Sequence, residues 1–197
     1  MRVTGTDWSM SPEVADAFGT AVIRFITERH WSDADLAHLP DEYRYEIIDG
    51  RLLVTPPASD AHEDWCDWAR YLLHAAALTG WRVKSNIGLK YPERSLIPDL
   101  VVLSPDTPRA ENVYNPVVPA LVVEVESPLT KAVDRVDKLE AYAVAGIGAY
   151  WRIERAGTVN VYRLAGDSYG DPLVLKPHDS VELDYPYPVT VVVPDGA

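Results

Sequence analysis

The sequence predicts a single α/β domain built around a mixed β-sheet, and three observations support this. Its 197 residues suffice for one domain with its own hydrophobic core. With 47% hydrophobic and 24% charged residues, the composition is that of an ordinary globular protein and excludes a disordered or low-complexity chain. Helical and strand patterns alternate along the chain, with no internal repeat and no linker to divide it.

Two helices are predicted near the N-terminus. Apolar residues recur at helical spacing over residues 11–28, with Ser11 in position to cap the first turn, and this predicts a peripheral helix. A second, short helix is predicted over residues 33–39, capped by Ser32 and ended by Pro40.

A hairpin and a long helix are predicted next. Residues 43–54 form two β-prone runs on either side of Asp49-Gly50, a dipeptide typical of two-residue hairpin turns. A helix can then begin at Ser59 or Asp60. One stripe of this helix is apolar, and it consists of Trp65, Ala69, Leu72, Leu73 and Ala76.

The second half of the chain is predicted to be mostly β, with one helix. The nearly uninterrupted apolar run at residues 120–126 is typical of a central strand buried on both faces. Prolines mark residues 104–119 as a loop, and periodicity predicts a helix over about residues 131–145. Further strands are predicted at residues 81–90, 96–103, 149–154 and 158–164, followed by short β segments.

The charge and the single cysteine exclude several classes of function. Acidic residues outnumber basic ones by 30 to 18, and the net charge of −12 argues against broad, unspecific binding to nucleic acids or anionic lipids. A local phosphodiester site is still possible, because a bound divalent cation reverses the local field. Cys66 alone can form neither an intramolecular disulfide nor a cysteine-rich metal site, and no stretch resembles a signal peptide or membrane span. We therefore expect a cytoplasmic protein with no membrane contact.

Two acidic residues are attached to strands that otherwise belong in a core. Asp99 precedes one apolar run, and Glu124 stands near the end of another. An ionised carboxylate in such a place is costly unless it is paired, hydrogen-bonded or bound to a metal. If the two strands are neighbours, both carboxylates can reach one hard cation such as Mg²⁺ or Mn²⁺. Alternatively, each acid lies at a strand end in water.

The helix predicted after Glu124 carries Asp134, Lys138 and Tyr142 on one face, because these residues are spaced four apart. A lysine on this face can project toward the carboxylates, where it would position a water molecule or stabilise charge on a phosphate. The alternative is an ordinary ion pair between Asp134 and Lys138 on a solvated face.

Several short motifs occur in an order and spacing that resemble one protein family. They comprise residues 45–52, 57–62, 98–102, 121–125 and 127–128, together with Asp134, Arg135, Lys138, Tyr142, Gly146, Tyr150 and Trp151. These motifs resemble the Uma2-like restriction endonucleases of the PD-(D/E)xK nuclease superfamily, over about residues 32–164. The resemblance implies a restriction-endonuclease-like core. Residues 1–31 are then an N-terminal helical extension and residues 165–197 a β-rich extension of the same domain.

The resemblance implies a metal-dependent endonuclease that hydrolyses phosphodiester bonds of DNA. Asp99 and Glu124 are the implied metal-binding acids, Glu46 completes the acidic site, and Mg²⁺ is the implied cofactor, with Mn²⁺ as a substitute. The usual lysine position of the superfamily is Glu126 here, and the Uma2-like pattern supplies the catalytic lysine from the next helix, at Lys138. Glu126 either adds a metal ligand or points to solvent. A homodimer is also expected, because two active sites must meet the two strands of a duplex.

His62 and Tyr142 are further candidates for contact with the substrate or with one of the acids. For His62, at the start of the long helix, the alternative is a surface histidine. His62 and Cys66 are spaced four residues apart, but without a CxxC motif or a second histidine pair this spacing does not predict a zinc site. Cys66 is expected to be a small packing residue.

Two other functions remain open from the sequence. The first is a noncatalytic nuclease-fold module that binds DNA or a protein partner. The acidic balance favours it, since no stripe of basic residues is visible to hold a duplex. Metal affinity at Asp99 and Glu124 would distinguish this module from the endonuclease. The second is a glycoside hydrolase that uses two carboxylates, although the lysine on the helix is not required for that chemistry.

Overall fold

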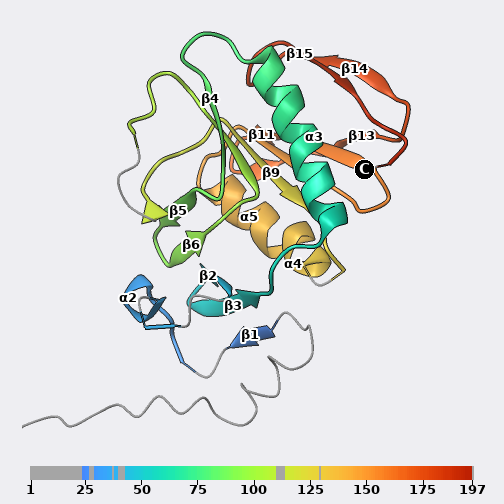
Figure 1. Ribbon diagram of the computed structural model, residues 1–197. Coiled ribbons are helices and arrows are strands. Elements are labelled where there is room, and N and C mark those ends of the chain that lie inside the picture. The colour runs from blue at the N-terminus through green and yellow to red at the C-terminus, as the bar shows by residue number, and fades with distance from the viewer. Residues whose placement is uncertain are drawn as a thin grey trace, which may run out of the picture.

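The computed structural model describes residues 24–26, 29–36, 38–39, 43–109, 114–128 and 130–196. It contains two main β-sheets with helices packed against them (Figure 1). Each sheet combines parallel and antiparallel strand pairs, so the predicted mixed α/β class is confirmed.

The six-stranded sheet is built around the predicted hairpin. The turn residues Asp49 and Gly50 both have positive φ, 51° and 72°, as a two-residue hairpin turn of this kind requires. The strands of this sheet are β1 (Arg24–Ile26), β2 (Arg44–Ile48), β3 (Arg51–Thr55), β5 (Gly88–Tyr91), β6 (Arg94–Leu96) and β8 (Tyr114–Asn115). Their order is β1-β3-β2-β6-β5-β8, so β2 lies in the interior of the sheet.

The seven-stranded sheet contains the predicted central strand. Its strands are β4 (Arg82–Ser85), β7 (Leu100–Leu103), β9 (Leu121–Val125), β10 (Ala149–Ile153), β11 (Val159–Ala165), β12 (Ser168–Tyr169) and β13 (Leu173–Leu175). Their order is β12-β11-β10-β9-β7-β4, with β13 paired to β11. β9 runs parallel to β10 and antiparallel to β7. All five residues of β9 are buried, which confirms the predicted strand.

Helices cover both faces of the larger sheet (Figure 1). The helices are α2 (Asp33–Leu36), α3 (Asp60–Ala76), α4 (Lys131–Arg135) and α5 (Asp137–Val144). On one face, Leu73 of α3 shares a core with Val123 of β9. On the other face, Tyr142 of α5 shares a second core with Val122. Because successive strand residues point to opposite faces, β9 contributes to both cores.

The end of the predicted N-terminal helix is a strand. Residues 24–26 form β1, which pairs antiparallel with β3 and sets Phe25 opposite Leu53. The helix predicted over residues 11–28 is therefore wrong at this end, because pairing with a sheet edge outweighs helical spacing. The rest of that range lies outside the described residues. The short helix predicted over residues 33–39 begins as expected, but α2 ends at Leu36 and a turn follows.

Three predicted elements are each divided in two. The strand predicted over residues 81–90 becomes β4 and β5 in different sheets, because Asn86 between them has a φ of +52° that interrupts the extended backbone. The strand predicted over residues 96–103 is interrupted at Pro98, which has no N–H to donate to a ladder and stands between β6 and β7. The helix predicted over residues 131–145 is interrupted at Val136, which has non-helical φ and ψ of −125° and −69°. The two strand breaks carry the chain from one sheet to the other and back.

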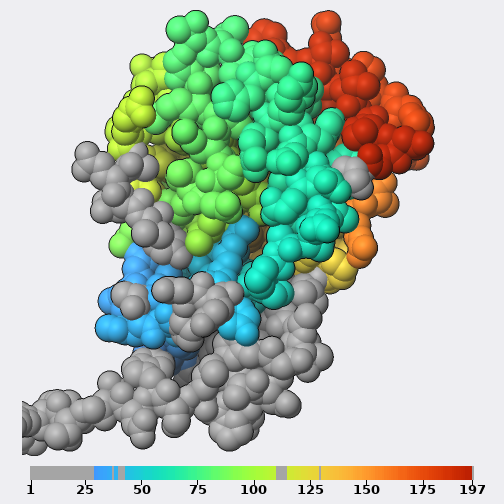
Figure 2. All heavy atoms as spheres, viewed as in Figure 1, coloured from blue at the N-terminus to red at the C-terminus, as the bar shows by residue number. Residues whose placement is uncertain are grey.

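The C-terminal segment packs on the same core as α3. β14 (Ser180–Leu183) and β15 (Val189–Val192) pair antiparallel, which confirms the predicted short β segments. The Tyr187 hydroxyl donates a hydrogen bond to the backbone carbonyl of Leu73 in α3 at 2.6 Å. Figure 2 shows these last strands, in red, against the green and teal helix α3. Within the described residues, no helix combines the length and apolarity needed to cross a bilayer.

Candidate active site

The pairing of β7 with β9 brings two acidic residues to one place. Leu100 lies opposite Val123 in this antiparallel pair, so Asp99, just before β7, comes beside the Glu124 end of β9. Both residues are buried, 6% and 2% exposed, and both line a cleft of about 570 Å³. The two strands are therefore neighbours, and the alternative of two strand ends in water is wrong.

The third predicted acid comes from the other sheet. Glu46 lies on β2 and is 1% exposed. Its Oε1 accepts a hydrogen bond from the backbone N–H of Ile97 at 2.8 Å. Ile97 lies in the connection from β6 to β7, two residues before Asp99. This bond ties the two sheets together at the cleft, which Glu46 also lines.

Lys138 reaches the acids from α5. Its Nζ lies 2.8 Å from Glu124 Oε1, 3.2 Å from Glu46 Oε1 and 3.7 Å from Asp134 Oδ1. Its side chain is almost fully buried, so the alternative of a surface ion pair is wrong. Burial alone would lower the pKa of Lys138, but these three carboxylates raise it above its ordinary value. The lysine is therefore charged at neutral pH.

Asp99 is held by three groups. Its Oδ1 accepts a hydrogen bond from Arg44 Nη1 at 2.9 Å, and its Oδ2 accepts one from the backbone N–H of Val125 at 2.8 Å. His62 Nε2 lies 3.2 Å from the same Oδ2. Burial would raise the pKa of Asp99, but Arg44, His62 and Lys138 outweigh it and hold this pKa below its ordinary value. Asp99 is thus ionised at neutral pH.

Arg44 is a further residue of the site that was not predicted, although the sequence holds a signal for it. Arg44 and Glu46 are two residues apart on β2, and side chains at this spacing point to the same face of a sheet. Arg44 Nε lies 4.0 Å from Glu46 Oε2, and Arg44 also lines the cleft. The signal is therefore a basic residue, Arg44, two positions before the predicted acid Glu46 on one strand.

Two acids of the cluster bind protons more tightly than usual. Burial raises the pKa of Glu124, and the nearby Asp99, Asp134 and Glu46 raise it further, although Lys138 opposes the shift. Burial likewise raises the pKa of Asp134 to about 6. For His62, burial lowers the pKa, but the hydrogen bond and charge of Asp99 raise it above its ordinary value overall. Each of the three groups therefore keeps its proton up to a higher pH in the folded protein than in the unfolded chain.

These shifts predict how stability depends on pH. Between about pH 5 and about pH 8 the folded, metal-free protein binds more protons than the unfolded chain, so its free energy of unfolding decreases as the pH rises. One pKa unit corresponds to about 1.4 kcal/mol. Because these buried groups titrate as a coupled set, the expected loss is smaller than the sum of their separate shifts and is on the order of 2 kcal/mol. Urea denaturation in EDTA at a series of pH values measures it. A free energy that stays constant or increases over this range would contradict the prediction.

Tyr142 lies behind the cleft rather than in it. Its side chain is fully buried, and its hydroxyl donates a hydrogen bond to Glu124 Oε1 at 2.5 Å. Lys138 Nζ approaches the same oxygen, so two donors fix the Glu124 carboxylate. Tyr142 is not among the residues that line the cleft, and the contact that the structure shows is with the acid Glu124.

Glu126 belongs to a separate ion-pair network. It is 5% exposed, and its two oxygens accept hydrogen bonds from Arg135 Nε at 2.6 Å and Nη2 at 3.0 Å. Its Oε1 also accepts a hydrogen bond from Arg152 Nη1 at 2.7 Å. Glu126 therefore does not point to solvent, and it does not line the cleft as a further metal ligand would.

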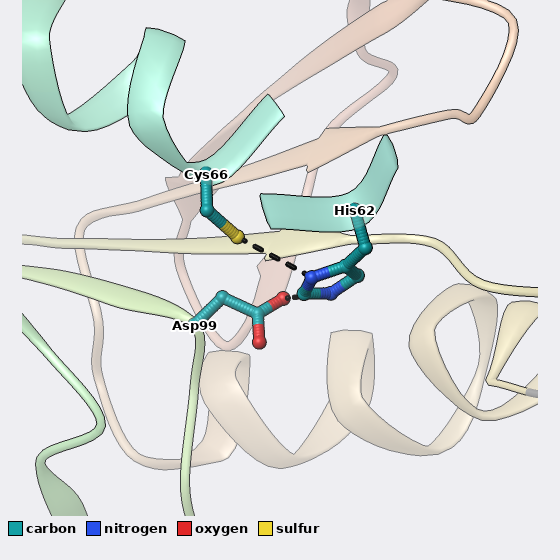
Figure 3. A group of neighbouring side chains, drawn as sticks. All are labelled: His62, Cys66 and Asp99. Atoms are coloured by element: carbon teal, nitrogen blue, oxygen red, sulfur yellow. Dashed lines mark hydrogen bonds and ion pairs between the residues drawn. The ribbon is translucent and has the colours of Figure 1, made fainter. Parts of the chain in front are cut away.

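His62 and Cys66 meet Asp99 at one wall of the cleft. Figure 3 shows both side chains projecting from α3 toward the carboxylate. His62 is 13% exposed, so it is not a surface histidine, while its role toward substrate stays a prediction. Cys66 points from α3 into the core that the helix shares with the larger sheet, as expected of a packing residue. Its Sγ also lies 3.6 Å from His62 Nδ1.

The residues present fit a hard divalent cation. The central cluster consists of four buried carboxylates and two cations, namely Glu46, Asp99, Glu124, Asp134, Arg44 and Lys138. Once a cation displaces the protons that Glu124 and Asp134 bind, and with His62 neutral, the cluster carries two negative charges in excess. Carboxylate oxygens are the ligands that Mg²⁺ and Mn²⁺ prefer, and one such ion would balance this charge.

Comparison with known proteins identifies the family of this chain. Residues 33–192 match the sequence model of Uma2, which is described as a putative restriction endonuclease. The chain belongs to the Uma2 family. The Uma2 match runs past residue 164, where the motif resemblance ends, and includes β12 to β15, the strands of the C-terminal segment.

A solved structure shares the Uma2 fold of this chain. It is the crystal structure of a putative nuclease belonging to DUF820 from Anabaena variabilis ATCC 29413. The two structures align with a TM-score of 0.65 and 19% sequence identity, over 76% of this chain and 87% of the other. At this identity the likeness shows the fold alone. No match was found among curated proteins.

Proposed function

We propose that the protein is a metal-dependent endonuclease that hydrolyses phosphodiester bonds of DNA. The observation that carries the proposal is the contact of the buried Lys138 with Glu124 and Glu46 in the cleft that Asp99 also lines. The Uma2 family is described as a putative restriction endonuclease, which supports the class of reaction.

The proposed metal ligands are Asp99, Glu124 and Glu46, and the proposed ion is Mg²⁺, with Mn²⁺ as a substitute. When bound, the ion polarises the phosphate and lowers the pKa of the attacking water. Arg44 positions Asp99, and Tyr142 positions Glu124, through the hydrogen bonds described above.

Lys138 is the proposed catalytic cation. Lys138 lines the cleft, and its ammonium group donates a hydrogen bond to Glu124 Oε1. From there it would orient the attacking water and stabilise the negative charge that develops on the phosphate. The water would attack phosphorus in line with the leaving oxygen. Cleavage of both strands of a duplex needs two such sites, so a homodimer is part of the proposal.

Calorimetry and plasmid nicking on the same samples test the proposal. Mg²⁺ and Mn²⁺ are titrated into the wild-type protein and into the double variant Asp99→Asn/Glu124→Gln, which keeps the side-chain shapes. The matched control is Glu140→Gln/Asp167→Asn, which makes the same changes at exposed positions. We expect metal binding and nicking in the wild type and in the control, and loss of both in the site variant. A wild-type protein that binds neither ion would overturn the proposal.

The second candidate is a noncatalytic nuclease-fold module that binds DNA or a protein partner. Two observations favour it. The net charge is −12, and the carboxylates of the cleft are already paired with Arg44 and Lys138. Such a module has no reason to keep affinity for a metal, so the same titration separates the two functions.

A further inference from the structure

The group His62, Cys66 and Asp99 combines three kinds of metal ligand at one point. An imidazole nitrogen, a thiol sulfur and a carboxylate oxygen all lie within 4.8 Å of one another. The first two come from successive turns of α3 and the third from the residue just before β7, so the tertiary fold creates the group (Figure 3). We propose that these three residues form a second metal site, which binds a transition-metal cation of the Zn²⁺ class.

Two of the separations match those between ligands of a tetrahedral ion, but they involve different nitrogens of His62. Bonds of about 2.0–2.3 Å to a tetrahedral ion place neighbouring ligand atoms roughly 3.3–3.8 Å apart. His62 Nδ1 lies 3.6 Å from Cys66 Sγ, and His62 Nε2 lies 3.2 Å from Asp99 Oδ2. An ion uses only one of these nitrogens, so binding requires the imidazole to turn until that nitrogen faces both Cys66 and Asp99. The three ligand atoms, which lie within 4.8 Å of one another, must also draw closer together.

The ligand set differs in kind from the carboxylate cluster. Thiolate and imidazole ligands select Zn²⁺ and related ions, whereas Mg²⁺ takes oxygen ligands. Asp99 Oδ1 accepts the hydrogen bond of Arg44, and Oδ2 accepts that of the Val125 N–H, so Asp99 would serve this site through the remaining lone pair of Oδ2. The site would therefore share Asp99 with the proposed magnesium site but would not need Glu46, Glu124 or Lys138. It does not depend on nuclease activity.

The surroundings leave one coordination position open. His62 and Asp99 line the cleft, whereas Cys66 is buried behind them and does not line it. Three protein ligands with a fourth position open to solvent are typical of accessible zinc sites. Binding breaks the Cys66 S–H bond and forms a sulfur–metal bond, and the proton passes to solvent. Glu63, whose Oε1 lies 3.6 Å from His62 Nδ1, adds negative charge nearby.

Cobalt spectroscopy tests the proposal directly. Co²⁺ serves as the probe, because it occupies sites of the Zn²⁺ type and shows a near-ultraviolet charge-transfer band when bound to a thiolate. Cys66 is the single cysteine of the chain, so such a band reports this residue alone. We expect a band that saturates at one equivalent of Co²⁺ and disappears when Zn²⁺ is added. The band is expected to be absent from Cys66→Ser and retained in Glu124→Gln.

A matched pair of histidine variants supplies the second measurement. His62→Gln should weaken Co²⁺ binding by about tenfold or more. His74→Gln, at an exposed position near the end of the same helix, should leave it unchanged. Absence of the band in folded wild-type protein would overturn the proposal, as would equal affinities in the two histidine variants. Failure of the proposed nuclease function would appear in the nicking assay and would leave the cobalt band unaffected.

Discussion

Replacement of Lys138 by methionine is expected to reduce plasmid nicking by about 10²–10⁴-fold while Mg²⁺ binding persists. Methionine is an unbranched side chain of similar length, but it removes the ammonium group that lies between Glu124 and Glu46. Loss of a positive charge beside the proposed ligands does not weaken their attraction for a cation. Calorimetry should therefore give an Mg²⁺ affinity equal to or above that of the wild type, whereas single-turnover nicking should be nearly lost.

Lys131→Met is the matched control for this experiment. Lys131 lies on α4 at an exposed position, and no residue of the cleft is changed by its replacement. It should nick at the wild-type rate. If Lys138→Met also nicked at that rate, with normal Mg²⁺ binding, the lysine would have no part in the reaction.

Replacement of Glu126 by alanine is expected to lower the free energy of unfolding by about 3 kcal/mol. The change leaves Arg152, which is 7% exposed, without the carboxylate 2.7 Å from its Nη1. Glu154 lies 3.6 Å from Arg152 Nη2 and offers partial compensation, and Arg135 is one-third exposed. The decrease in the free energy of unfolding should therefore fall at the lower end of the range seen when a buried ion pair loses one partner.

Urea denaturation of Glu126→Ala measures this effect against Glu140→Ala. Glu140 is exposed on α5, and its replacement should change the free energy of unfolding by less than about 0.5 kcal/mol. Similar values for both variants would show that the network of Glu126 with Arg135 and Arg152 contributes little to stability.

Local patterns predicted the elements that depend on local chemistry. The hairpin at Asp49-Gly50, the apolar stripe of α3 and the buried strand β9 each follow from a turn dipeptide or a periodicity, and all three are present. The errors concern the ends and interruptions of elements, because these depend on partners that are distant in sequence. Residues 24–26 are a strand because β3 offers them an edge.

The site was predictable to the extent that its residues stand on predicted elements. Asp99, Glu124 and Lys138 were recognised from acids on apolar strands and from helical spacing, and the fold brings them to one cleft. Arg44 was missed although it stands two residues before Glu46, because its contact with Asp99, 55 residues away, does not follow from that spacing. Cys66 was assigned to packing because the spacing along α3 relates it only to His62. The third member of the group, Asp99, is brought to them by the fold.

The hydrogen bond from Ile97 to Glu46 makes the cleft a junction between the two sheets. Asp99 and Glu124 belong to one sheet and Glu46 to the other, so the distance between the sheets sets the distance between the proposed ligands. A small shift of one sheet against the other would alter metal affinity without changing any residue of the cleft. We therefore expect substitutions far from the cleft, at the contact between the sheets, to change the affinity of the cleft for the ion.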